Sequence, residues 1–435
     1  MRSALVAGIV AVAFADSSIV VLGLPQLYTR FETSITGVSW IVTSYNAAVA
    51  VTALVLVFFV HRLRVRFVFA GGLLLFLAAT IACALAQSLW FLIGARSVQG
   101  VGAGLLLAGA LPLASARVWT LAGTFGAALG PALGGVLTQL FDWRAIFVAQ
   151  APVAAAALLA VARRQDEPAP GKGRRSSLRR TIPANACIGL VFGALVGALF
   201  LAVLLVIVVW QYSPIGGALI VSVLPAAALA VRPLARLLPR LVAIYGGAAL
   251  LACGLAALAL LPSASVPIAM CALALCGGGL GLAVPDLSDA ALDPGAGRTR
   301  SGALTIGVRH LGLVAAIASI APLLASDLPK YGDRAELKAT AVLLDAPISI
   351  TDKVPIALDL RSAFNKAQDG EIPDLAKPFD ARGARTDSKL AAARDELVAA
   401  IEESITRAFR PDFFLAAFAA AAALLAAFMR RSLVA

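Results

Sequence analysis

The chain contains about a dozen apolar runs, each close to 20 residues long. About 20 apolar residues in a helix cross the roughly 30 Å hydrocarbon core of a bilayer. Hydrophobic residues make up 60% of the 435 residues and charged residues only 14%, whereas about a quarter of a soluble domain is charged. These features predict an all-α polytopic membrane protein and exclude a soluble globular enzyme.

Arginine clusters, prolines and glycines divide the apolar runs into two groups of six predicted transmembrane helices. The first group covers 4–25, 38–60, 66–86, 90–115, 118–140 and 144–162. The second group covers 184–210, 214–231, 241–261, 266–285, 302–325 and 412–430. We therefore expect an N-terminal six-helix half at 1–162, a basic cytoplasmic linker at 163–182, five helices of a C-terminal half at 183–325, a polar insertion at 326–411, and a last helix with its tail at 412–435.

The first run also resembles a signal peptide, because Arg2 precedes an apolar stretch and Ala13-Phe14-Ala15 fits a cleavage site. The run continues to Pro25, which makes it long enough to span a bilayer. We therefore expect a retained first helix.

The distribution of Lys and Arg orients the predicted helices. With a cytoplasmic N-terminus, the inner segments carry 19 Lys and Arg, whereas the short outer loops carry only Arg30 and Arg144. Positive residues concentrate on the cytoplasmic side of membrane proteins. We therefore expect both termini in the cytoplasm and a multi-pass protein of the bacterial cell membrane. The net charge of +12 reflects this bias, so the lipid bilayer is an expected partner and nucleic acid is not.

The insertion at 326–411 differs from the rest of the chain and is expected outside the cell. Residues 327–410 hold 13 bases and 15 acids. The pattern over 388–409 predicts an amphipathic helix with Asp387 or Ser388 as its N-cap and Pro411 at its end. The proline-rich first part is expected to be irregular or weakly strand-like. The sequence identifies no protein partner for this insertion.

Several classes of site are excluded by the residues present. The five cysteines lie in apolar runs without C-x-x-C spacing, and there are two histidines, so neither a disulfide framework nor a metal site is indicated. No G-x-x-x-x-G-K-[ST] phosphate loop is present, which argues against an ATP-driven pump. We expect no enzymatic activity, because no histidine is paired with a suitable nucleophile.

Three motifs carry a family resemblance. The sequence reads A-D-S-S-I-V-V followed by L-P in the first predicted helix, R-x-x-Q-G-x-G-A in the fourth and G-x-x-x-G-P-x-x-G-G in the fifth. Together they resemble the multidrug-efflux, drug:proton antiporter branch of the major facilitator superfamily, although that branch usually has fourteen helices. The residues that match these motifs are Asp16, Arg96, Gln99, Gly100, Gly102, Gly126, Gly130, Pro131, Gly134 and Gly135.

The resemblance implies a major facilitator fold, a small-molecule substrate, and protons as the coupling ion. It implies no cofactor, since a proton gradient would supply the energy. The chain departs from the family in the loop at 60–66, which keeps the bases but lacks the usual Gly and Asp. The insertion at 326–411 is also longer than that branch needs.

Two charged residues inside apolar runs are the main candidates for proton coupling. A charge at mid-membrane costs at least about 2.5 to 3.5 kcal/mol, so a charge that persists usually faces the bundle interior and has a partner. Asp16 lies near the middle of the first predicted helix and Arg96 lies in the fourth, and these helices are neighbours in the family fold. Asp16 could therefore be the proton-binding group and Arg96 its modulator. Alternatively, the two form a purely structural pair, or Asp16 caps a break near Pro25.

The remaining candidates have both a functional and a structural interpretation. The glycines of the fifth helix could form a moving or a static packing face, with Pro131 favouring movement. Asp286 and Asp289, with Arg298, could form a cytoplasmic gate or a solvated acidic face. Tyr45 and Asn46 could line a substrate path or anchor the helix at the membrane interface. Arg309 and His310 are secondary candidates, for which contacts with loop carbonyls or headgroups are the favoured interpretation.

The sequence favours a secondary transporter that exports a small amphipathic compound in exchange for protons. The alternative is a transporter-derived membrane protein whose extracellular insertion binds a partner or lipid. The identity of the substrate is not encoded in a cavity expected to be lined mainly by Ala, Leu and Val.

Overall fold

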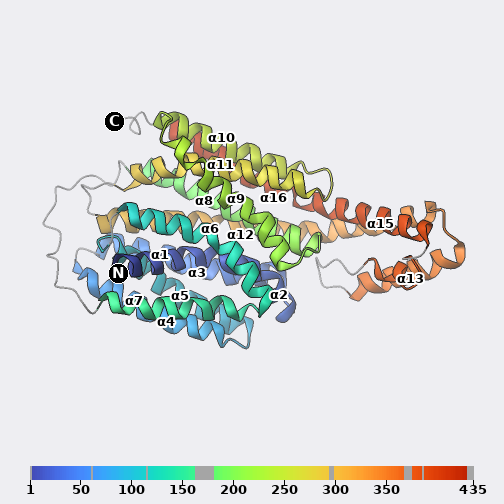
Figure 1. The fold of residues 1–435 in the computed structure, drawn as a ribbon, viewed down its shortest axis with the longest axis horizontal. Coiled ribbons are helices and arrows are strands. Elements are labelled where there is room, and N and C mark those ends of the chain that lie inside the picture. The colour runs from blue at the N-terminus through green and yellow to red at the C-terminus, as the bar shows by residue number, and fades with distance from the viewer. Residues whose placement is uncertain are drawn as a thin grey trace.

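The computed structural model describes residues 2–59, 62–113, 116–161, 181–292, 298–366, 375–384 and 387–428. Within these ranges the chain forms a bundle of long helices and no strands (Figure 1). The long helices that precede residue 162 are α1 (Arg2–Ile19), α3 (Ile35–Phe59), α4 (Val65–Ala84), α5 (Leu89–Ala110), α6 (Ala116–Leu140) and α7 (Arg144–Val161). Those of the second part are α8 (Ile182–Val203), α9 (Pro214–Ala235), α10 (Arg240–Ala259), α11 (Val266–Ala291), α12 (Arg298–Asp345) and α16 (Arg410–Phe428).

Nine helices in the described ranges are long and apolar enough to cross a membrane. The described part of α7 adds a shorter apolar helix, Arg144–Leu159. The all-helical membrane fold expected from the sequence is confirmed, whereas the number of twelve spans and the side of each terminus stay predictions. α1 begins and α16 ends at the same end of the bundle (Figure 1).

Two helices change their winding inside the bundle. α1 passes into a 3₁₀ segment, η1 (Val20–Gly23), and then into α2 (Leu24–Arg30), whose first turn contains Pro25. Proline lacks the backbone N–H that a continuous helix needs, so the first run bends there. α8 ends in a π-helical segment, η4 (Leu204–Val209).

The two groups of helices meet mainly along two pairs of neighbours. α3 packs along α12, and α6 packs against α9. Small residues allow the close approaches: a Cβ on Gly135 of α6 would lie 2.2 Å from the Cβ of Ala218 on α9. Within the second group, a Cβ on Gly312 of α12 would lie 2.0 Å from the carbonyl oxygen of Gly189 on α8.

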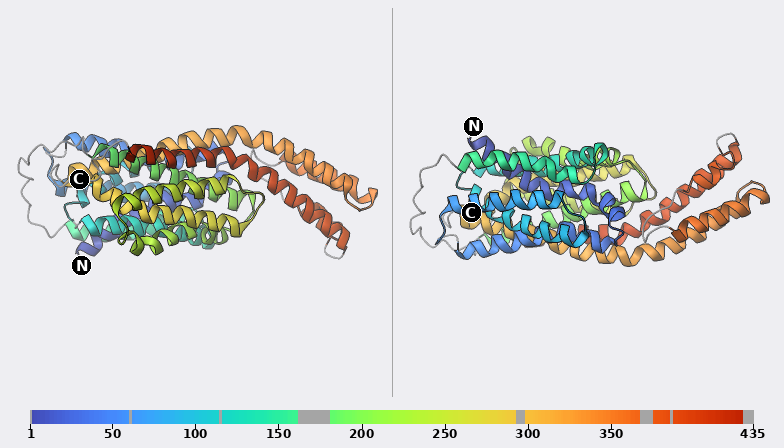
Figure 2. Two further views of the ribbon diagram at one scale, coloured as in Figure 1. Left: turned by 90° about the horizontal axis from the view of Figure 1, so that it is seen from above. Right: turned by 90° about the horizontal axis from the view of Figure 1, so that it is seen from below.

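A helical hairpin projects from the end of the bundle opposite the start of α1 (Figure 2). It consists of the outer part of α12, then α13 (Ile350–Lys366), α14 (Lys377–Asp380) and α15 (Ser388–Thr406). We call residues 326–406 the outer hairpin. The expected helix boundary at residue 325 is wrong, because α12 continues for 48 residues to Asp345.

The expectation of an irregular or strand-like first part of the insertion is also wrong. Buried Ala335, Ala339 and Leu343 recur every four residues along α12, and α12 packs against α15, whose Leu397 and Ile401 are buried. This stripe gives the polar segment an apolar face that a helix can bury. Pro329 and Pro355 lie inside helices, and Pro347 lies in the bend between α12 and α13.

The amphipathic helix predicted over 388–409 is confirmed as α15. Its N-cap is Asp387, whose carboxylate accepts hydrogen bonds from the backbone N–H groups of Lys389 and Leu390. Pro411 does not end this helix. The chain passes through a short 3₁₀ segment, Arg407–Phe409, directly into α16, in which Pro411 occupies the first turn, where its missing N–H costs nothing.

Candidate functional site

Asp16 and Arg96 form an ion pair in the interior of the first group of helices. Arg96 Nη1 of α5 donates to Asp16 Oδ2 of α1, and both side chains are fully buried. Gln150 of α7 donates from Nε2 to the other carboxylate oxygen, Oδ1, at 2.7 Å. The carboxylate therefore joins three helices, and it has a charged and a neutral donor.

Gln99 extends this network from the same Arg96 nitrogen that donates to Asp16. Its Oε1 accepts from Arg96 Nη1 at 2.7 Å, and its Nε2 donates to Thr80 Oγ1 of α4 at 2.8 Å. Arg96 Nε also donates to the carbonyl oxygen of Ile41 at 3.1 Å. Buried charges need such partners, because the desolvation cost of each ion is several kcal/mol. Asp16 thus belongs to a polar network in the bundle and does not cap the bend near Pro25.

Tyr45 covers one face of the Arg96 guanidinium. The Cζ of Arg96 lies 4.2 Å from the centre of the Tyr45 ring, within the range of a cation–π contact. The Tyr45 hydroxyl donates to the carbonyl oxygen of Ala13 at 2.9 Å, so α3 is tied to α1 beside the ion pair. Tyr45 is fully buried, which contradicts the interfacial interpretation of this residue.

Asn46 connects the first group of helices to α12. Its Oδ1 lies 2.7 Å from His310 Nδ1 and accepts from Ser17 Oγ at 3.0 Å. Asn46 Nδ2 donates to the carbonyl oxygen of Val42 at 2.8 Å. The side chains of Asn46, His310 and Ser17 are all buried, so they form a second polar link inside the bundle. In the sequence, Ser17 directly follows Asp16 and Asn46 directly follows Tyr45.

A central cavity lies between the two groups of helices, with about 1240 Å³ of empty space that includes its open mouth. Its walls are mostly apolar, and they come from α1, α6, α8, α9, α11 and α12. Ser17 and Ser18 lie beside it, one and two residues after Asp16, whereas Asp16 and Arg96 are not part of its lining. Pro131 of the fifth-helix motif lines it too.

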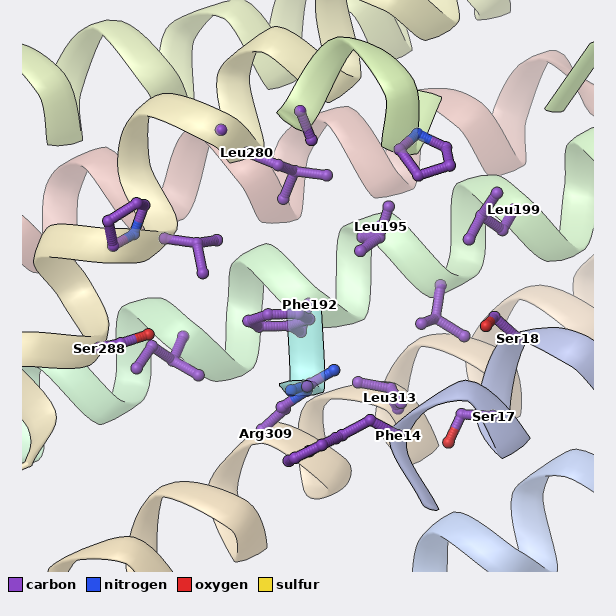
Figure 3. Close-up of a pocket in the computed structure, with 18 of the residues that line it drawn as sticks. Phe14, Ser17, Ser18, Phe192, Leu195, Leu199, Leu280, Ser288, Arg309 and Leu313 are labelled. Atoms are coloured by element: carbon purple, nitrogen blue, oxygen red, sulfur yellow. The ribbon is translucent and has the colours of Figure 1, made fainter. Parts of the chain in front are cut away.

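Arg309 is one of the charged residues that line this cavity, and its side chain lies between Phe192 and Phe14 (Figure 3). Its Cζ lies 3.9 Å from the ring centre of Phe192 and 4.4 Å from that of Phe14. The expected contact with loop carbonyls or headgroups is therefore wrong for Arg309, which lies between aromatic rings from α8 and α1. It is also wrong for His310, which contacts Asn46. The eleventh predicted helix corresponds to the first part of α12. α12 packs on both α3 and α8 and lines the cavity at this level.

The glycines of the fifth-helix motif bring α6 against two neighbours. Added Cβ atoms would lie 2.0 Å from the Ala11 carbonyl oxygen at Gly126 and 2.5 Å from the Ile19 carbonyl oxygen at Gly134. A Cβ added to Gly130 would lie 2.1 Å from Ser18 Oγ. The motif therefore packs on α1, while Gly135 faces α9. Both the static and the moving interpretation fit this contact.

The glycines of the R-x-x-Q-G-x-G-A motif, in the fourth predicted helix, allow similarly close packing of α5 on its neighbours. A Cβ on Gly100 would lie 2.3 Å from the Tyr45 carbonyl oxygen of α3, and one on Gly102 would lie 2.5 Å from the backbone nitrogen of Phe76 of α4. These contacts fix the height of Arg96 relative to Tyr45.

The gate candidates are only partly brought together. Arg240 Nη2 donates to the backbone oxygen of Asp286 at 3.1 Å, and Asp289 lies one turn further along α11. The side chain of Arg298 lies outside the described part of the chain. Arg300, close by on α12, donates to the carbonyl oxygen of Val57 at 3.1 Å. In the described ranges no ion pair joins Asp286 or Asp289 to Arg300.

Sequence reasoning missed several residues of the site. Gln150 and Thr80 are polar residues inside apolar runs, and that signal could have identified both as network members. The helix predicted over 214–231 stops before Arg232, whereas α9 continues to Ala235, so Arg232 lies in its last turn and lines the cavity. Phe192 has no distinguishing signal among the many apolar residues of its helix.

Comparison with known proteins identifies the family of the chain. The Major Facilitator Superfamily matches residues 6–317. The multidrug resistance protein Stp of Mycobacterium tuberculosis (strain CDC 1551 / Oshkosh) is 31% identical over 203 residues, which are 44% of this chain and 36% of that protein. The methylenomycin A resistance protein of Bacillus subtilis (strain 168) is 29% identical over 196 residues, 42% of each chain. The matches thus span less than half of these relatives' lengths.

Solved structures share the fold at low sequence identity. A bacterial homolog of the human lysosomal transporter Spinster, in an inward-facing and unoccupied conformation, matches with a TM-score of 0.62, 16% identity, and coverage of 100% of this chain and 97% of that one. The D-xylose-proton symporter matches with a TM-score of 0.58, 15% identity, and coverage of 73% and 88%. The family match over residues 6–317 shows that the chain belongs to the Major Facilitator Superfamily, and it is a multi-pass protein of the plasma membrane.

Proposed function

We propose that this transporter exports a small amphipathic compound in exchange for protons, by alternating access of the central cavity. Asp16 is the proton-binding group and Arg96 modulates it. The observation that carries the proposal is that the fully buried Asp16 carboxylate holds donors from α5 and α7 and directly precedes Ser17 and Ser18 at the cavity. Two relatives named for drug resistance support the export of a drug-like compound.

Proton binding at Asp16 would change the forces that hold α1 in place. A neutral carboxyl no longer neutralises Arg96, and an unpaired buried charge costs several kcal/mol. Protonation therefore favours an arrangement in which Arg96 finds another partner or water. Because Ser17 and Ser18 lie on the same helix as Asp16, such a shift would move part of the cavity wall.

The position of the cavity fits the inward-open state of an alternating-access transport cycle. It reaches Arg232, Ser288 and Leu292 near the ends of α9 and α11, which the distribution of basic residues predicts to be cytoplasmic. At the other end of the bundle, Gly135 of α6 and Ala218 of α9 are in close contact. With the predicted orientation, the cavity is open toward the cytoplasm and closed toward the outside.

The proposal is tested in proteoliposomes with an imposed pH gradient and a panel of labelled anionic, neutral and cationic amphipathic compounds. We expect flux of at least one compound, its loss with a protonophore, and a decrease of about tenfold or more in gradient-driven flux for Asp16→Asn. Asp142→Asn is the control, since Asp142 is an exposed carboxylate beside Arg144. Flux that ignores the pH gradient in the unsubstituted protein would contradict proton coupling.

The outer hairpin supports a second candidate function, the binding of a partner or lipid outside the cell. Leu337, Leu344, Ile350 and Val354 of the hairpin are exposed apolar side chains, and such groups mark interaction surfaces when they cluster. Deletion of 330–405 separates the two functions. Loss of a cellular phenotype on this deletion, in a protein that shows no flux of any panel compound, would favour the second function.

A further inference from the structure

Arg309 lies half-buried in the cavity wall and carries a charge that no described residue neutralises. Asp16 and Arg96 neutralise each other, whereas none of the described residues forms an ion pair with Arg309 or accepts a hydrogen bond from it. Its Nε is buried and has no partner. A cation without a partner in a largely apolar cavity is costly, so its presence requires an explanation.

Aromatic rings hold the Arg309 guanidinium by its two faces. Phe192 of α8 lies on one side at 3.9 Å, and Phe14 of α1 lies at 4.4 Å. Cation–π contacts stabilise the charge but leave the N–H groups at the edge of the planar guanidinium free. The edge is the part of arginine that binds carboxylate, phosphate or sulfonate groups, often through two parallel hydrogen bonds.

The rest of the cavity has the same electrostatic sign. Its lining contains a second cation, Arg232, and no Asp or Glu among the described residues. Hydroxyl groups of Ser17, Ser18, Ser288 and Thr305 are the other polar side chains of the wall. A cationic compound would meet uncompensated repulsion here, whereas an anion would supply the missing partner.

We propose that the transported compound is a small organic anion, with one carboxylate, phosphate or sulfonate group on an apolar body, and that Arg309 binds its anionic group. This inference rests on the proposed transport function and specifies its substrate class. The apolar wall from α8 and α11 would contact the body of the compound, and Arg232 would attract the anion from the cytoplasmic end.

The test is a binding measurement on the purified full-length protein in nanodiscs of neutral lipid, without any gradient. Three probes share one aromatic body: 2-naphthoate, 2-naphthylmethanol and 2-naphthylmethylammonium. By isothermal titration at pH 7 we expect 2-naphthoate to bind most tightly. Arg309→Gln should weaken its binding by about tenfold or more, while the binding of 2-naphthylmethanol changes by less than about twofold.

Arg334→Gln is the matched control. Arg334 lies on the same helix and also covers an aromatic ring, Tyr331, at 5.1 Å, but it belongs to the outer hairpin and not to the cavity. We expect unchanged affinity for 2-naphthoate. Arg309→Lys keeps the charge without the planar edge, so it should retain part of the affinity. If Arg309→Gln fails to fold, the order of the affinities of the three probes for the unsubstituted protein still tests whether the cavity prefers an anion.

The inference would be overturned if the cationic probe bound more tightly than 2-naphthoate. It would also be overturned if Arg309→Gln lost as much affinity for the neutral probe as for the anionic probe. Phosphatidylglycerol in the nanodiscs distinguishes two sources of the anionic group. Unchanged affinity for 2-naphthoate assigns the site to soluble anions, and competition assigns it to lipid headgroups; both results support an anion site. Proton coupling is not needed for this binding, so anion binding without gradient-driven flux would refute only the proposed antiport.

Discussion

Nδ1 of His310 lies 2.7 Å from Oδ1 of Asn46, and this contact links α12 of the second helix group to α3 of the first. The amide oxygen of Asn46 can only accept, so His310 donates from Nδ1. Its other ring nitrogen, Nε2, is buried without a partner. The histidine is therefore a fixed polar contact between the two groups of helices, next to the arginine that lies in the cavity.

Asn46→Leu should destabilise the protein by about 2 kcal/mol, because it leaves two buried donors, His310 Nδ1 and Ser17 Oγ, without their acceptor. Thermal unfolding of the purified protein in detergent measures the change. Asn185→Leu is the control, because the Oδ1 of Asn185 is buried and unpartnered, so we expect a much smaller loss. Equal losses in both variants would show that the contact with His310 is not a stabilising link.

Gly126→Ala should be poorly tolerated. The new Cβ would lie 2.0 Å from the Ala11 carbonyl oxygen, which forces α6 away from α1 at a cost of about 1 to 3 kcal/mol. Gly71→Ala is the control, since nothing lies within 4 Å of its Cβ position in α4, and alanine favours a helix over glycine. Yield and thermal stability of the two variants measure the difference, and a stable Gly126→Ala protein would contradict the close contact.

The outer hairpin should become more stable on acidification. Burial raises the pKa of Glu402 in α15, so its folded form binds a proton more tightly than its unfolded form. The stabilisation is complete below the unfolded pKa and is lost as pH rises through the raised folded pKa. Because Glu402 is half-buried, we expect an effect of less than about 1 kcal/mol.

Hydrogen exchange of α15 between acidic and neutral pH measures this effect. Glu402→Gln should remove the pH dependence and strengthen protection at neutral pH. Glu403→Gln is the neighbouring control, because Glu403 pairs with Arg407 and Lys338 and its substitution should weaken protection. Weaker protection in Glu402→Gln would refute the assignment.

The predicted topology is checked by labelling single cysteines in a cysteine-free background. We expect Lys172→Cys, which lies outside the described part of the chain, to react only with reagents that reach the cytoplasm. Leu358→Cys of α13, where the leucine is exposed, should react from outside the cell. External reaction at position 172 would invert the predicted orientation.

The sequence predicted the buried ion pair but not its surroundings. Asp16 and Arg96 were identifiable because charges are rare in apolar runs, and the motif placed them on neighbouring helices. The place of Arg309 in the cavity wall was not predicted, because position along a helix does not tell which face meets the cavity. Phe14 and Phe192, which hold it, look like any other apolar residues of their helices.

The predicted helices agree closely with the observed ones where apolar runs end in prolines or charges. The end of α12 was misjudged, because hydropathy falls at Ser326 while the backbone stays helical through Asp345. The periodic Ala335, Ala339 and Leu343 carry the signal for that continuation, but it only has meaning once α15 is known to pack against them.

The continuity of α12 has a mechanical consequence. At about 1.5 Å per residue its 48 residues follow a continuous helical path of roughly 70 Å, with Pro322 and Pro329 inside it, which carries Arg309 near one end and the outer hairpin at the other. A tilt of a few degrees at the guanidinium that is transmitted past these prolines would displace the tip by several ångströms. An antibody fragment that binds the tip from outside the cell would change ligand binding in the cavity without entering it.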